Sequence, residues 1–504
     1  MKNITNKSEN KLDISQENNI IIIRLITIIL SEVFTVKFLG RHEELATLER
    51  EYFNNHSFVV IYGRRRIGKT TLIKEFIKNK KALYFLADIE SERQNMNKLT
   101  RKIADFIGQP YLADVRFESW QKLFTAFADN CPEQQKILVI DEFQHLVQSN
   151  PAFPSVFQEV WDEIFMQKNI MVILCGSHIS MMLSEVLNHS SPLYGRRTAQ
   201  IRLQPLKFSE FSQAFPEHSF EDRVKIYSVT GGVPKYIEFF CNSRSLEENI
   251  RLNVLSKSGF LYEEPLFLLE KEVREPLSYF SVMRAISMGN HKLSDIATVL
   301  ESKSNTLSPY LSTLMNLFLI EKRVPVTEKE PEKSRKGLYY ISDIFMDFWF
   351  KFIYPYRSEL ELDNAEYVID RLNSNFIDRH VSFVYEKVCA EIFIQLCREK
   401  KIDFHISKIG SYWNGNTEID VVAVDNQSKT IFAGECKFYD RPVDIRVYSA
   451  LVEKCRTISE FNGYRMIHGL FSKSGFDERV VELAENNDNL ILVNREQTLF
   501  QKQI

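Results

Sequence analysis

Two stretches of this 504-residue chain bring together side chains that could act on phosphate groups. Residues 58–76, FVVIYGRRRIGKTTLIKEF, separate a glycine from Gly-Lys-Thr by four residues. Residues 417–438, TEIDVVAVDNQSKTIFAGECKF, place acids and a lysine along a hairpin pattern. Loops of the first kind hold the phosphates of nucleoside triphosphates, and converging acids of the second kind hold the metal ions that assist phosphodiester cleavage.

The glycine-rich stretch has the spacing and the context of a phosphate-binding loop. An apolar strand precedes it and a helix follows, so backbone N–H groups would face phosphate oxygens at the helix N-terminus. Lys69 would reach the β- and γ-phosphates of ATP, and the Thr70 hydroxyl would bind Mg²⁺. The predicted nucleotide-binding residues are Gly63, Arg64, Arg65, Arg66, Ile67, Gly68, Lys69, Thr70 and Thr71.

Acids for the same chemistry end a second apolar run, KILVIDEF. Asp141 would hold Mg²⁺ through water, and Glu142 would polarise the attacking water. A third run, IMVILCGSHIS, ends near Ser177, which is predicted beside the γ-phosphate, between the two earlier strands. The alternative for Ser177 is a turn that merely leaves a strand.

Two later segments supply further cations. Arg196 and Arg197 in SPLYGRRT could neutralise charge on the transferring phosphate, in cis or from a neighbouring subunit. They could equally be surface charges or DNA contacts. In TGGVPKY, residues 230–236, Lys235 could contact the nucleotide, although the proline also suits a simple helix start.

Taken in order, these motifs resemble the archaeal-type ATPase family, a branch of the AAA+/STAND-like P-loop ATPases. FLGRHEEL, YGRRRIGKTTL, LVIDEFQ, LCGS, PLYGRRT and TGGVPKY carry the resemblance, which spans residues 38 to about 260. It implies an ASCE-type parallel sheet with a helical lid, ATP binding, and ATP hydrolysis. His178 departs from relatives that often have a second small polar residue there.

The C-terminal hairpin could bind a divalent metal. Asp420 begins a predicted strand, the chain turns after Asp425, and Glu435 and Lys437 lie two residues apart on the returning strand. Alternate residues of a strand point to one face, so Glu435 and Lys437 should lie together. Glu386, on the preceding helix FVYEKVCAEIF, could approach them. Asp420 and Glu435 are the predicted metal ligands.

This set resembles the PD-(D/E)xK nuclease fold over residues 376–504, with Asp420, Glu435 and Lys437 in the motif positions. Ile419 precedes the first acid, where the family pattern often has proline. The resemblance implies cleavage of nucleic acid or, in a degenerate domain, binding of DNA or a protein partner. Domains of this kind recur at the C-terminus of archaeal-type ATPases, which accounts for both motifs in one chain.

Between the two motifs, residues 275–325 are predicted to form three helices, followed by two strand-like segments around the charged stretch TEKEPEKSRKG. The pattern resembles a winged helix-turn-helix, which implies either DNA contacts or a protein–protein module. The third helix is poor in Arg and Lys, which weakens the DNA alternative. The candidate DNA contacts are Ser308, Tyr310 and Ser312 on that helix and Lys329, Lys333, Arg335 and Lys336 on the wing.

The elements that position these residues define an α/β protein. Short apolar runs alternate with helical stretches up to residue 270, which predicts a parallel sheet buried on both faces. The predicted parts are a leader (1–37), a P-loop ATPase domain with a helical lid (38–270), a winged-helix-like domain (271–355), a connection (356–375) and a PD-(D/E)xK-like α/β domain (376–504).

Composition limits the location and the partners. The chain is 44% hydrophobic and 26% charged with a net charge of −3, so a nucleic-acid surface would be a local patch. Its seven cysteines lack a CxxC pair, which favours a reducing cytoplasm over a disulfide framework or a zinc site. The apolar run from Ile20 to Leu30 is shorter than the roughly 20 residues that span a bilayer, so no membrane contact is predicted.

Three functions are compatible with these residues. The first is an ATP-hydrolysing protein whose C-terminal domain cuts nucleic acid under nucleotide control. The second is a non-cleaving, nucleotide-gated switch that binds DNA or protein. The third is a signalling ATPase that forms homo-oligomers and whose arginines act across subunits. ATP and Mg²⁺ are the predicted ligands of the protein.

Overall fold

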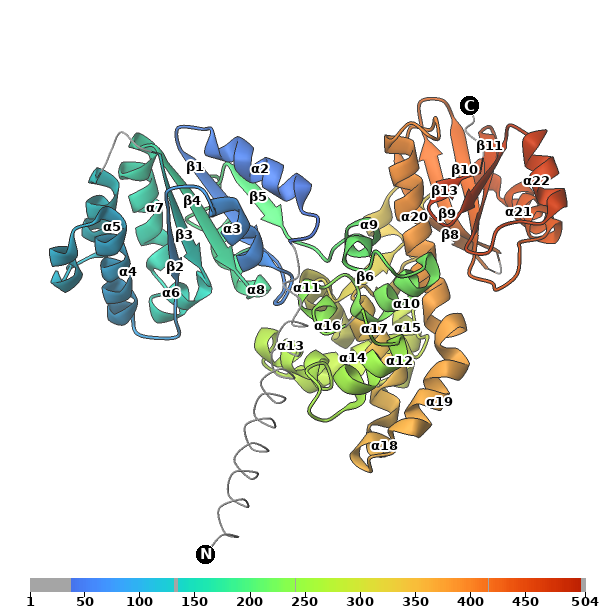
Figure 1. The fold of residues 1–504 in the computed structure, drawn as a ribbon, viewed down its shortest axis with the longest axis horizontal. Coiled ribbons are helices and arrows are strands. Elements are labelled where there is room, and N and C mark those ends of the chain that lie inside the picture. The colour runs from blue at the N-terminus through green and yellow to red at the C-terminus, as the bar shows by residue number, and fades with distance from the viewer. Residues whose placement is uncertain (1–37, 131–134, 241, 416, 500–504) are drawn as a thin grey trace, which may run out of the picture. The chain divides into compact units, whose positions relative to one another are not determined.

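The computed structural model describes residues 38–130, 135–240, 242–415 and 417–499 (Figure 1). The predicted leader of residues 1–37, with its isoleucine-rich run, lies outside these ranges. Across the described ranges, no helix has the length and apolar character that crossing a membrane requires. The five cysteines described there are free thiols: Cys175, Cys389, Cys397, Cys436 and Cys455.

Five parallel strands form the sheet of the N-terminal part, in the order β2-β3-β4-β1-β5. The residues of β1, β3 and β4 are all buried, as expected for strands that helices cover on both faces. The predicted parallel α/β sheet is confirmed. The strands are β1 Ser57–Tyr62, β2 Ala82–Leu86, β3 Lys136–Asp141, β4 Ile170–Gly176 and β5 Ala199–Arg202.

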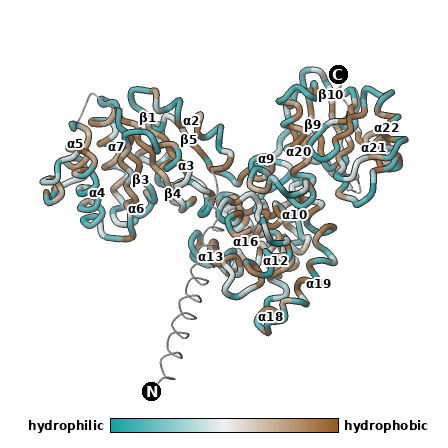
Figure 2. The backbone as a smooth tube through the Cα atoms, viewed as in Figure 1, coloured by the Kyte–Doolittle hydropathy of each residue, from teal (hydrophilic) through white to brown (hydrophobic). Residues whose placement is uncertain are grey.

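Helices flank this sheet in the order that the sequence pattern predicts (Figure 1). Phe124, Phe157 and Trp161 pack with Phe58 of β1 in a core rich in aromatic side chains, which appears as apolar backbone colouring in Figure 2. The helices are α2 His42–Tyr52, α3 Lys69–Ile77, α4 Glu92–Ile107, α5 Trp120–Asp129, α6 Gln144–Ser149, α7 Phe153–Glu163 and α8 Ile179–Met182.

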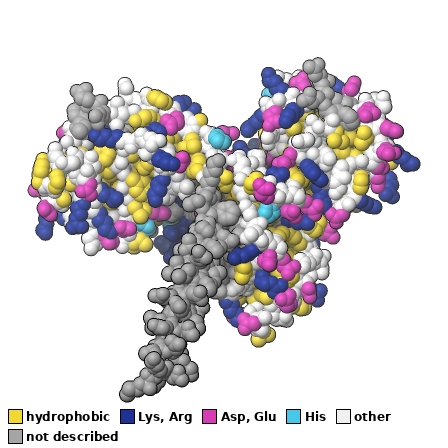
Figure 3. Space-filling model, viewed as in Figure 1, with side chains coloured by type: hydrophobic (Ala, Val, Ile, Leu, Met, Phe, Trp, Pro, Cys, Tyr) yellow, Lys and Arg dark blue, Asp and Glu magenta, His cyan; other side chains and the backbone are white. Residues whose placement is uncertain are grey.

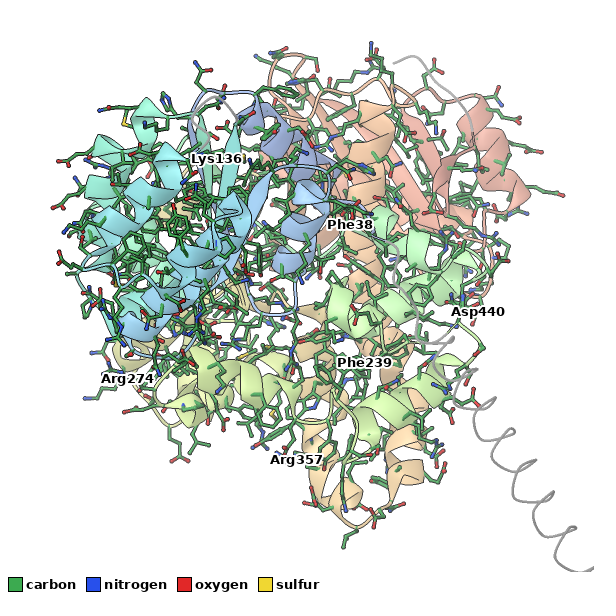
Figure 4. The ribbon with its side chains drawn as sticks, turned by 60° about the vertical axis from the view of Figure 1, so that its left-hand side comes forward. Phe38, Lys136, Phe239, Arg274, Arg357 and Asp440 are labelled. Atoms are coloured by element: carbon green, nitrogen blue, oxygen red, sulfur yellow. The ribbon has the colours of Figure 1, made fainter. Side chains whose placement is uncertain are left out.

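Lys136, labelled in Figure 4, opens β3 and is 1% exposed. Its Nζ atom donates hydrogen bonds to the carbonyl oxygens of Phe127 and Ala128 in the last turn of α5, both at 3.0 Å. A lysine beside the last carbonyls of a helix is favourable because that end carries partial negative charge. This contact fixes the end of α5 against the sheet.

Short helices follow the sheet in the region predicted as a lid. Ser219 caps α10 by accepting a hydrogen bond from the N–H of Asp222 at 3.1 Å, and Gly231 ends that helix with φ 61°. Pro234 occupies the first turn of α11, as the sequence indicates. The helices are α9 Phe208–Phe211, α10 Phe220–Thr230, α11 Pro234–Ile237, α12 Leu246–Ile250 and α13 Glu264–Glu272.

A two-stranded antiparallel sheet lies among the helices of the middle segment. The strands β6 and β7 pair from Ile320 with Ile341, on either side of the charged stretch. Leu307, Leu311 and Leu314 of α16 are buried. The elements are α14 Pro276–Ser287, α15 Leu293–Val299, α16 Ser304–Asn316, β6 Ile320–Arg323, β7 Leu338–Ile341 and α17 Ile344–Phe352, followed by α18 Arg357–Glu361 and α19 Ala365–Phe376.

A second, mixed sheet of six strands forms the C-terminal part, in the order β13-β12-β11-β10-β9-β8. Its core includes Leu451 of α21 and Val480 of α22, while Phe393 of α20 stacks on Phe432 of β10, with ring centroids 4.0 Å apart. The elements are α20 Ser382–Arg398, β8 Lys408–Asn414, β9 Thr417–Asp425, β10 Thr430–Lys437, α21 Ile445–Thr457, β11 Arg465–Ser472, α22 Glu478–Glu485, β12 Leu490–Asn494 and β13 Gln497–Thr498.

Candidate functional site

The glycine-rich loop joins β1 to the first turn of α3. Gly63 has φ 154° and Gly68 has φ 90°, which are backbone angles that residues with a Cβ atom rarely adopt. A Cβ atom at Gly63 would lie 2.6 Å from the carbonyl oxygen of Leu203. Ile67 is buried below the loop, and Thr71 is exposed on α3. The loop therefore keeps its backbone open at the N-terminus of α3, which is the geometry that binds phosphate.

Lys69 is buried and turns back onto the loop. Its Nζ atom donates hydrogen bonds to the carbonyl oxygens of Gly63 at 2.8 Å and Arg64 at 3.0 Å. Burial lowers the pKa of the Lys69 amine, because the charged form loses hydration. A phosphate would offer this amine a charged acceptor, which forms stronger hydrogen bonds than a carbonyl does.

Thr70 and Asp141 lie in direct contact. The Thr70 hydroxyl donates to Asp141 Oδ2 at 2.8 Å, and the Tyr84 hydroxyl of β2 donates to the same oxygen at 2.5 Å. The two predicted Mg²⁺-binding groups thus lie side by side at the end of the sheet. Tyr84 was not predicted from the sequence. The only feature there that could have indicated it is a single hydroxyl-bearing residue within the apolar run ALYFLA.

Glu142 has a left-handed backbone conformation, with φ 53°. Its Oε2 atom accepts hydrogen bonds from the Ser177 hydroxyl at 2.7 Å and from the side-chain amide of Gln144. Because β4 lies between β1 and β3, Ser177 approaches Glu142 from the strand next to the phosphate loop. Gln144 was not singled out in the sequence, although it lies two residues after Glu142 in the quoted motif.

Two loop arginines bind acids from later parts of the chain. Arg64 forms an ion pair with Asp343, the N-cap residue of α17, and Arg66 forms one with Glu264 in the first turn of α13. Glu264 is 0% exposed and accepts a hydrogen bond from the Tyr236 hydroxyl at 2.6 Å. A buried carboxylate thus pairs with each guanidinium, and the predicted contact of Arg64 and Arg66 with the nucleotide stays a prediction.

The charge of the third loop arginine, Arg65, lowers the pKa values of a neighbouring histidine and glutamate. His178 Nδ1 lies 3.6 Å from Oε2 of Glu272, the last residue of α13. Burial raises the pKa of Glu272 to about 7, although the charge of Arg65 lowers it. Burial and then the charge of Arg65 lower the pKa of His178. A carboxyl group from the end of α13 thus lies close to the phosphate loop, and the sequence did not predict it.

Lys235 does not point into the phosphate loop. Its Nζ atom lies 2.5 Å from Glu238, and 43% of its side chain is exposed. The neighbouring Pro234 packs on the loop instead, since a Cβ atom at Gly68 would lie 3.5 Å from Pro234 Cγ. Pro234 in the first turn of α11 agrees with a helix start, and the predicted contact of Lys235 with the nucleotide stays a prediction.

Arg196 is held by Asp162 of α7. Its Nε atom lies 3.1 Å from both carboxylate oxygens, and Nη2 lies 2.9 Å from Oδ2. Arg197 lies over the ring of Tyr194, 5.3 Å from the centroid. Arg196 is thus engaged in an ion pair within the sheet domain, whereas the predicted action of Arg197 on a phosphate stays a prediction.

The acids of the C-terminal hairpin lie where β9 and β10 pair. Asp420 Oδ2 accepts a hydrogen bond from the backbone N–H of Cys436 at 2.8 Å. Lys437 Nζ donates to Glu435 Oε1 at 2.7 Å, so these two side chains share a face. Lys454 of α21 also contacts Glu435, at 3.2 and 3.3 Å. Lys454 was not predicted, although it lies in a helix that immediately follows the hairpin.

Burial, together with repulsion between neighbouring carboxylates, raises the pKa values of two of these acids. Burial and then the charge of Glu435 raise the pKa of Asp420 to about 6. Burial and then the charges of Asp420 and Glu418 raise the pKa of Glu386. Among the residues that the structure describes, no group of three or more His, Cys, Asp or Glu side chains is arranged to hold a metal ion. Metal binding by Asp420 and Glu435 therefore stays a prediction.

The Asp420→Asn variant is expected to be more stable than the wild type at pH 7.5. The folded pKa of Asp420 lies above the unfolded value of about 3.9, so the native state binds the proton more tightly and loses stability as pH rises from about 4 to about 6. Above this window, the substitution should raise the free energy of unfolding by about 3 kcal/mol, because each pKa unit corresponds to about 1.4 kcal/mol. Urea denaturation across pH 4–8 measures this difference.

The exposed Asp403 provides the matched control, because Asp403→Asn removes one carboxylate from the same domain without touching the hairpin. Its stability difference from the wild type should not vary with pH. If Asp420→Asn and the wild type unfold at equal urea concentrations throughout pH 4–8, the carboxylates of the hairpin do not lie close enough to repel one another.

A cavity of about 320 Å³ opens beside Glu435 and Lys437. Tyr439, Arg441 and Arg446 also line it, and the Arg441 guanidinium lies 5.8 Å from the centre of the Tyr439 ring. Elsewhere, on the face shown in Figure 3, basic and acidic side chains are interspersed. Asp444 also lines the cavity, 2.7 Å from Arg446, so its three cations exceed the two carboxylates of Glu435 and Asp444 by one charge.

Two family models match the chain. The model for an ATPase domain found predominantly in Archaea matches residues 38–240. A second model, described as "Archaea bacterial proteins of unknown function", matches residues 349–448. The first match covers the sheet domain with the phosphate loop, and the second includes α20 and the β9–β10 hairpin.

The chain is 34% identical over 458 residues to an uncharacterized protein of Methanocaldococcus jannaschii, covering 90% of this chain and 98% of the relative. An uncharacterized ATP-binding protein of the same organism is 53% identical over 47 residues, or 9% of this chain and 80% of the relative. Among solved structures, a Walker-type ATPase of Pyrococcus abyssi matches with a TM-score of 0.48 and 19% identity, over 62% of this chain and 96% of that one.

Proposed function

The chain belongs to the same family as the 34%-identical Methanocaldococcus jannaschii protein, and we propose that its ATPase domain controls a C-terminal domain that cuts nucleic acid. The observation that carries this proposal is the pairing of Arg64 with Asp343 and of Arg66 with Glu264. Both acids lie beyond the sheet domain. A loop that changes conformation when it binds phosphate would act on these pairs directly.

The residues around the loop fit ATP and Mg²⁺. Bound Mg²⁺ would neutralise charge on the β- and γ-phosphates. Thr70 and Asp141, 2.8 Å apart, are the groups that would hold it. Glu142 would accept the proton of an attacking water, and its hydrogen bond from Ser177 supports this role. Lys69 would exchange its two carbonyl partners for phosphate oxygens.

Three features support a PD-(D/E)xK-type domain at the C-terminus. Asp420, Glu435 and Lys437 lie on paired strands of a mixed sheet, and burial and then the charge of Asp420 raise the pKa of Glu386 on α20. The basic cavity beside Glu435 could accept a phosphodiester backbone. A contact with the lid also exists, because Lys473 Nζ lies 2.7 Å from Glu221 of α10.

The middle segment is proposed to be a winged helix that relays the nucleotide state through protein contacts. Its third helix, α16, carries no Arg or Lys, and Ser308 Oγ donates to the carbonyl of Ser304 at 3.1 Å. On the wing, Lys336 Nζ lies 3.1 Å from Glu328, and Lys333 lies 2.8 Å from Glu330. These pairings leave little net positive charge for phosphate contacts.

A non-cleaving, nucleotide-gated switch is the second candidate. It is favoured by the two lysines, Lys437 and Lys454, that pair with Glu435. A carboxylate that is neutralised by two cations has less tendency to hold a metal ion, because metal and ammonium groups compete for the same oxygens. In this function the hairpin would bind DNA or a protein partner without hydrolysing it.

The Glu435→Gln variant is expected to lose Mg²⁺- or Mn²⁺-dependent cleavage of plasmid and single-stranded DNA, falling to the background of a no-enzyme reaction. ATP turnover should stay within twofold of the wild type, because Glu435 lies outside the ATPase domain. Gel assays of cleavage and phosphate-release assays on the same preparation, with and without ATP, measure both activities.

Two variants complete this experiment. Glu453→Gln changes an exposed glutamate of α21 and should cleave as the wild type does. Lys69→Ala should remove the effect of ATP on cleavage. Normal ATP turnover combined with no cleavage by the wild type, at any metal or nucleotide concentration, would reject the nuclease and leave the switch.

A further inference from the structure

A second cavity, of about 360 Å³, lies apart from both candidate sites. One wall comes from the end of α14 and from β6, β7 and α17 of the middle segment. The other comes from a π-helical turn, Ile377–Val381, and the first half of α20. The volume falls within the range of small-molecule sites, which begins at about 300 Å³.

Positive charge exceeds negative charge in this cavity. Its cations are Arg323, Lys351, Arg379 and Lys387, and the carboxylates are Asp347, Asp378 and the adjoining Glu321. Four cations against three carboxylates leave one positive charge in excess. Burial lowers the pKa of His291, which also lines the cavity, so its imidazole is neutral at pH 7.

Compared with Arg323 and Lys351, Lys387 lies farther from its carboxylate partner. Its Nζ atom lies 3.9 Å from Glu321 Oε1, an oxygen that already accepts hydrogen bonds from Arg323 at 2.6 and 2.8 Å. By contrast, Lys351 lies 2.7 Å from Asp347. Burial and then the charge of Arg323 lower the pKa of Lys387. Yet 34% of its side chain is accessible, so solvent or a ligand can reach the amine through the cavity.

Apolar side chains form the rest of the lining. Ile344 and Val384 contribute aliphatic surface, and the Phe383 ring stands at the wall with 53% of its surface exposed. Lys351 Nζ lies 5.7 Å from the centre of that ring. An exposed aromatic ring beside a group of cations can pack against the organic body of an anion while the cations bind its acidic oxygens.

We propose that this cavity binds a small phosphomonoester, whose phosphate contacts Lys387 and Arg323 and whose organic body packs on Phe383. A phosphomonoester carries a charge of about −1.5 to −2 at pH 7 and three acceptor oxygens, which match converging Lys and Arg side chains better than a single carboxylate does. The ester is a free mononucleotide or the 5′-phosphate end of a short strand. Both present the same chemical group.

Isothermal titration of the full chain with adenosine 5′-monophosphate tests this site. The phosphate loop is first saturated with ADP, so that the titrated ligand reports on the cavity alone. Saturable binding is expected, with an affinity that falls at higher salt. Adenosine, which lacks the phosphate, should bind at least tenfold more weakly. Lys387→Gln should weaken binding of the monophosphate at least tenfold.

Matched variants separate the site from general effects. Lys401→Gln changes a lysine just beyond the end of α20, where it lies 2.7 Å from Glu399, and should bind the monophosphate as the wild type does. Phe383→Ala removes a ring that is 53% exposed, so the buried core stays intact, and it should weaken binding at least threefold. Equal affinities of wild type and both cavity variants would overturn the proposal.

The source of the phosphate is decided by a pair of dinucleotides, one with a 5′-phosphate and one with a 5′-hydroxyl. Tighter binding of the phosphorylated dinucleotide than of the monophosphate identifies a strand end as the ligand. Binding of the monophosphate alone identifies a free nucleotide. If neither phosphorylated compound gives saturable binding at millimolar concentration, the cavity does not bind phosphomonoesters.

Discussion

The Glu142→Gln variant is expected to hydrolyse ATP about 10²- to 10⁴-fold more slowly than the wild type, while binding it with similar affinity. The amide keeps the size of the carboxylate and can still accept a hydrogen bond from Ser177, but it cannot take a proton from water. Asp141, Thr70 and Lys69 are untouched, so phosphate and metal binding should persist. Phosphate release at saturating ATP and equilibrium binding of a fluorescent ATP analogue measure the two effects.

Glu75→Gln is the matched control, because it removes an exposed carboxylate from α3 near the same loop. Its turnover should equal that of the wild type. If Glu142→Gln also turns over within twofold of the wild type, Glu142 is not the proton acceptor, and its contacts with Ser177 and Gln144 serve only to hold the end of β3.

The Arg66→Ala variant is expected to lower the free energy of unfolding by about 3–5 kcal/mol. Its partner Glu264 is fully buried, so removal of the guanidinium leaves a charged carboxylate with the Tyr236 hydroxyl but without its counter-charge. The double variant Arg66→Ala/Glu264→Gln should recover most of this loss, because the remaining group is neutral. Equilibrium urea denaturation of the single and double variants measures the energy of the pair.

An exposed ion pair in the same region provides the comparison for the energy of the buried pair. Lys235 and Glu238 lie 2.5 Å apart with 43% and 37% of their side chains exposed, and such pairs contribute about 0.2–1 kcal/mol. Removing Lys235 should therefore cost far less than removing Arg66. If the two substitutions have equal and small effects, the Arg66–Glu264 pair does not join the loop to the lid.

Local spacing was enough to predict the parts of the site that lie close together in sequence. The loop from Gly63 to Thr70 and the hairpin from Asp420 to Lys437 each follow from motif spacing and strand alternation. The parallel sheet followed from apolar runs between helices. These features depend on short-range backbone geometry, which a sequence pattern specifies directly.

The partners of the loop arginines could not be predicted in this way. Arg64 and Arg66 lie within the phosphate-loop motif, and only the packing of the chain brings Asp343 and Glu264 to them. Arg196 is similar, because Asp162 lies on a different helix. Ion pairs between distant segments leave no periodicity in the sequence.

Single polar groups within apolar patterns were missed for a related reason. Tyr84 lies in a strand whose other residues predict only a buried core, and its hydrogen bond to Asp141 depends on the pairing of β2 with β3. Lys454 lies on the amphipathic helix α21, where lysines are usually solvent-facing. In both cases the residue type is ordinary, and its function arises from its neighbours in space.

Helix α17 begins directly after the acid that pairs with the phosphate loop, Asp343, and further along it carries Asp347 and Lys351, which line the second cavity. Asp343, Asp347 and Lys351 follow one another at intervals of four residues, so they lie along one side of the helix. Suppose that binding of ATP shifts α17 through Arg64. Thermodynamic reciprocity then requires that a cavity ligand change the affinity for ATP by the same factor by which ATP changes the affinity for that ligand. The protein would then respond to the concentrations of ATP and of the cavity ligand together. The concentration of either ligand would change the concentration of the other that is needed for half-saturation.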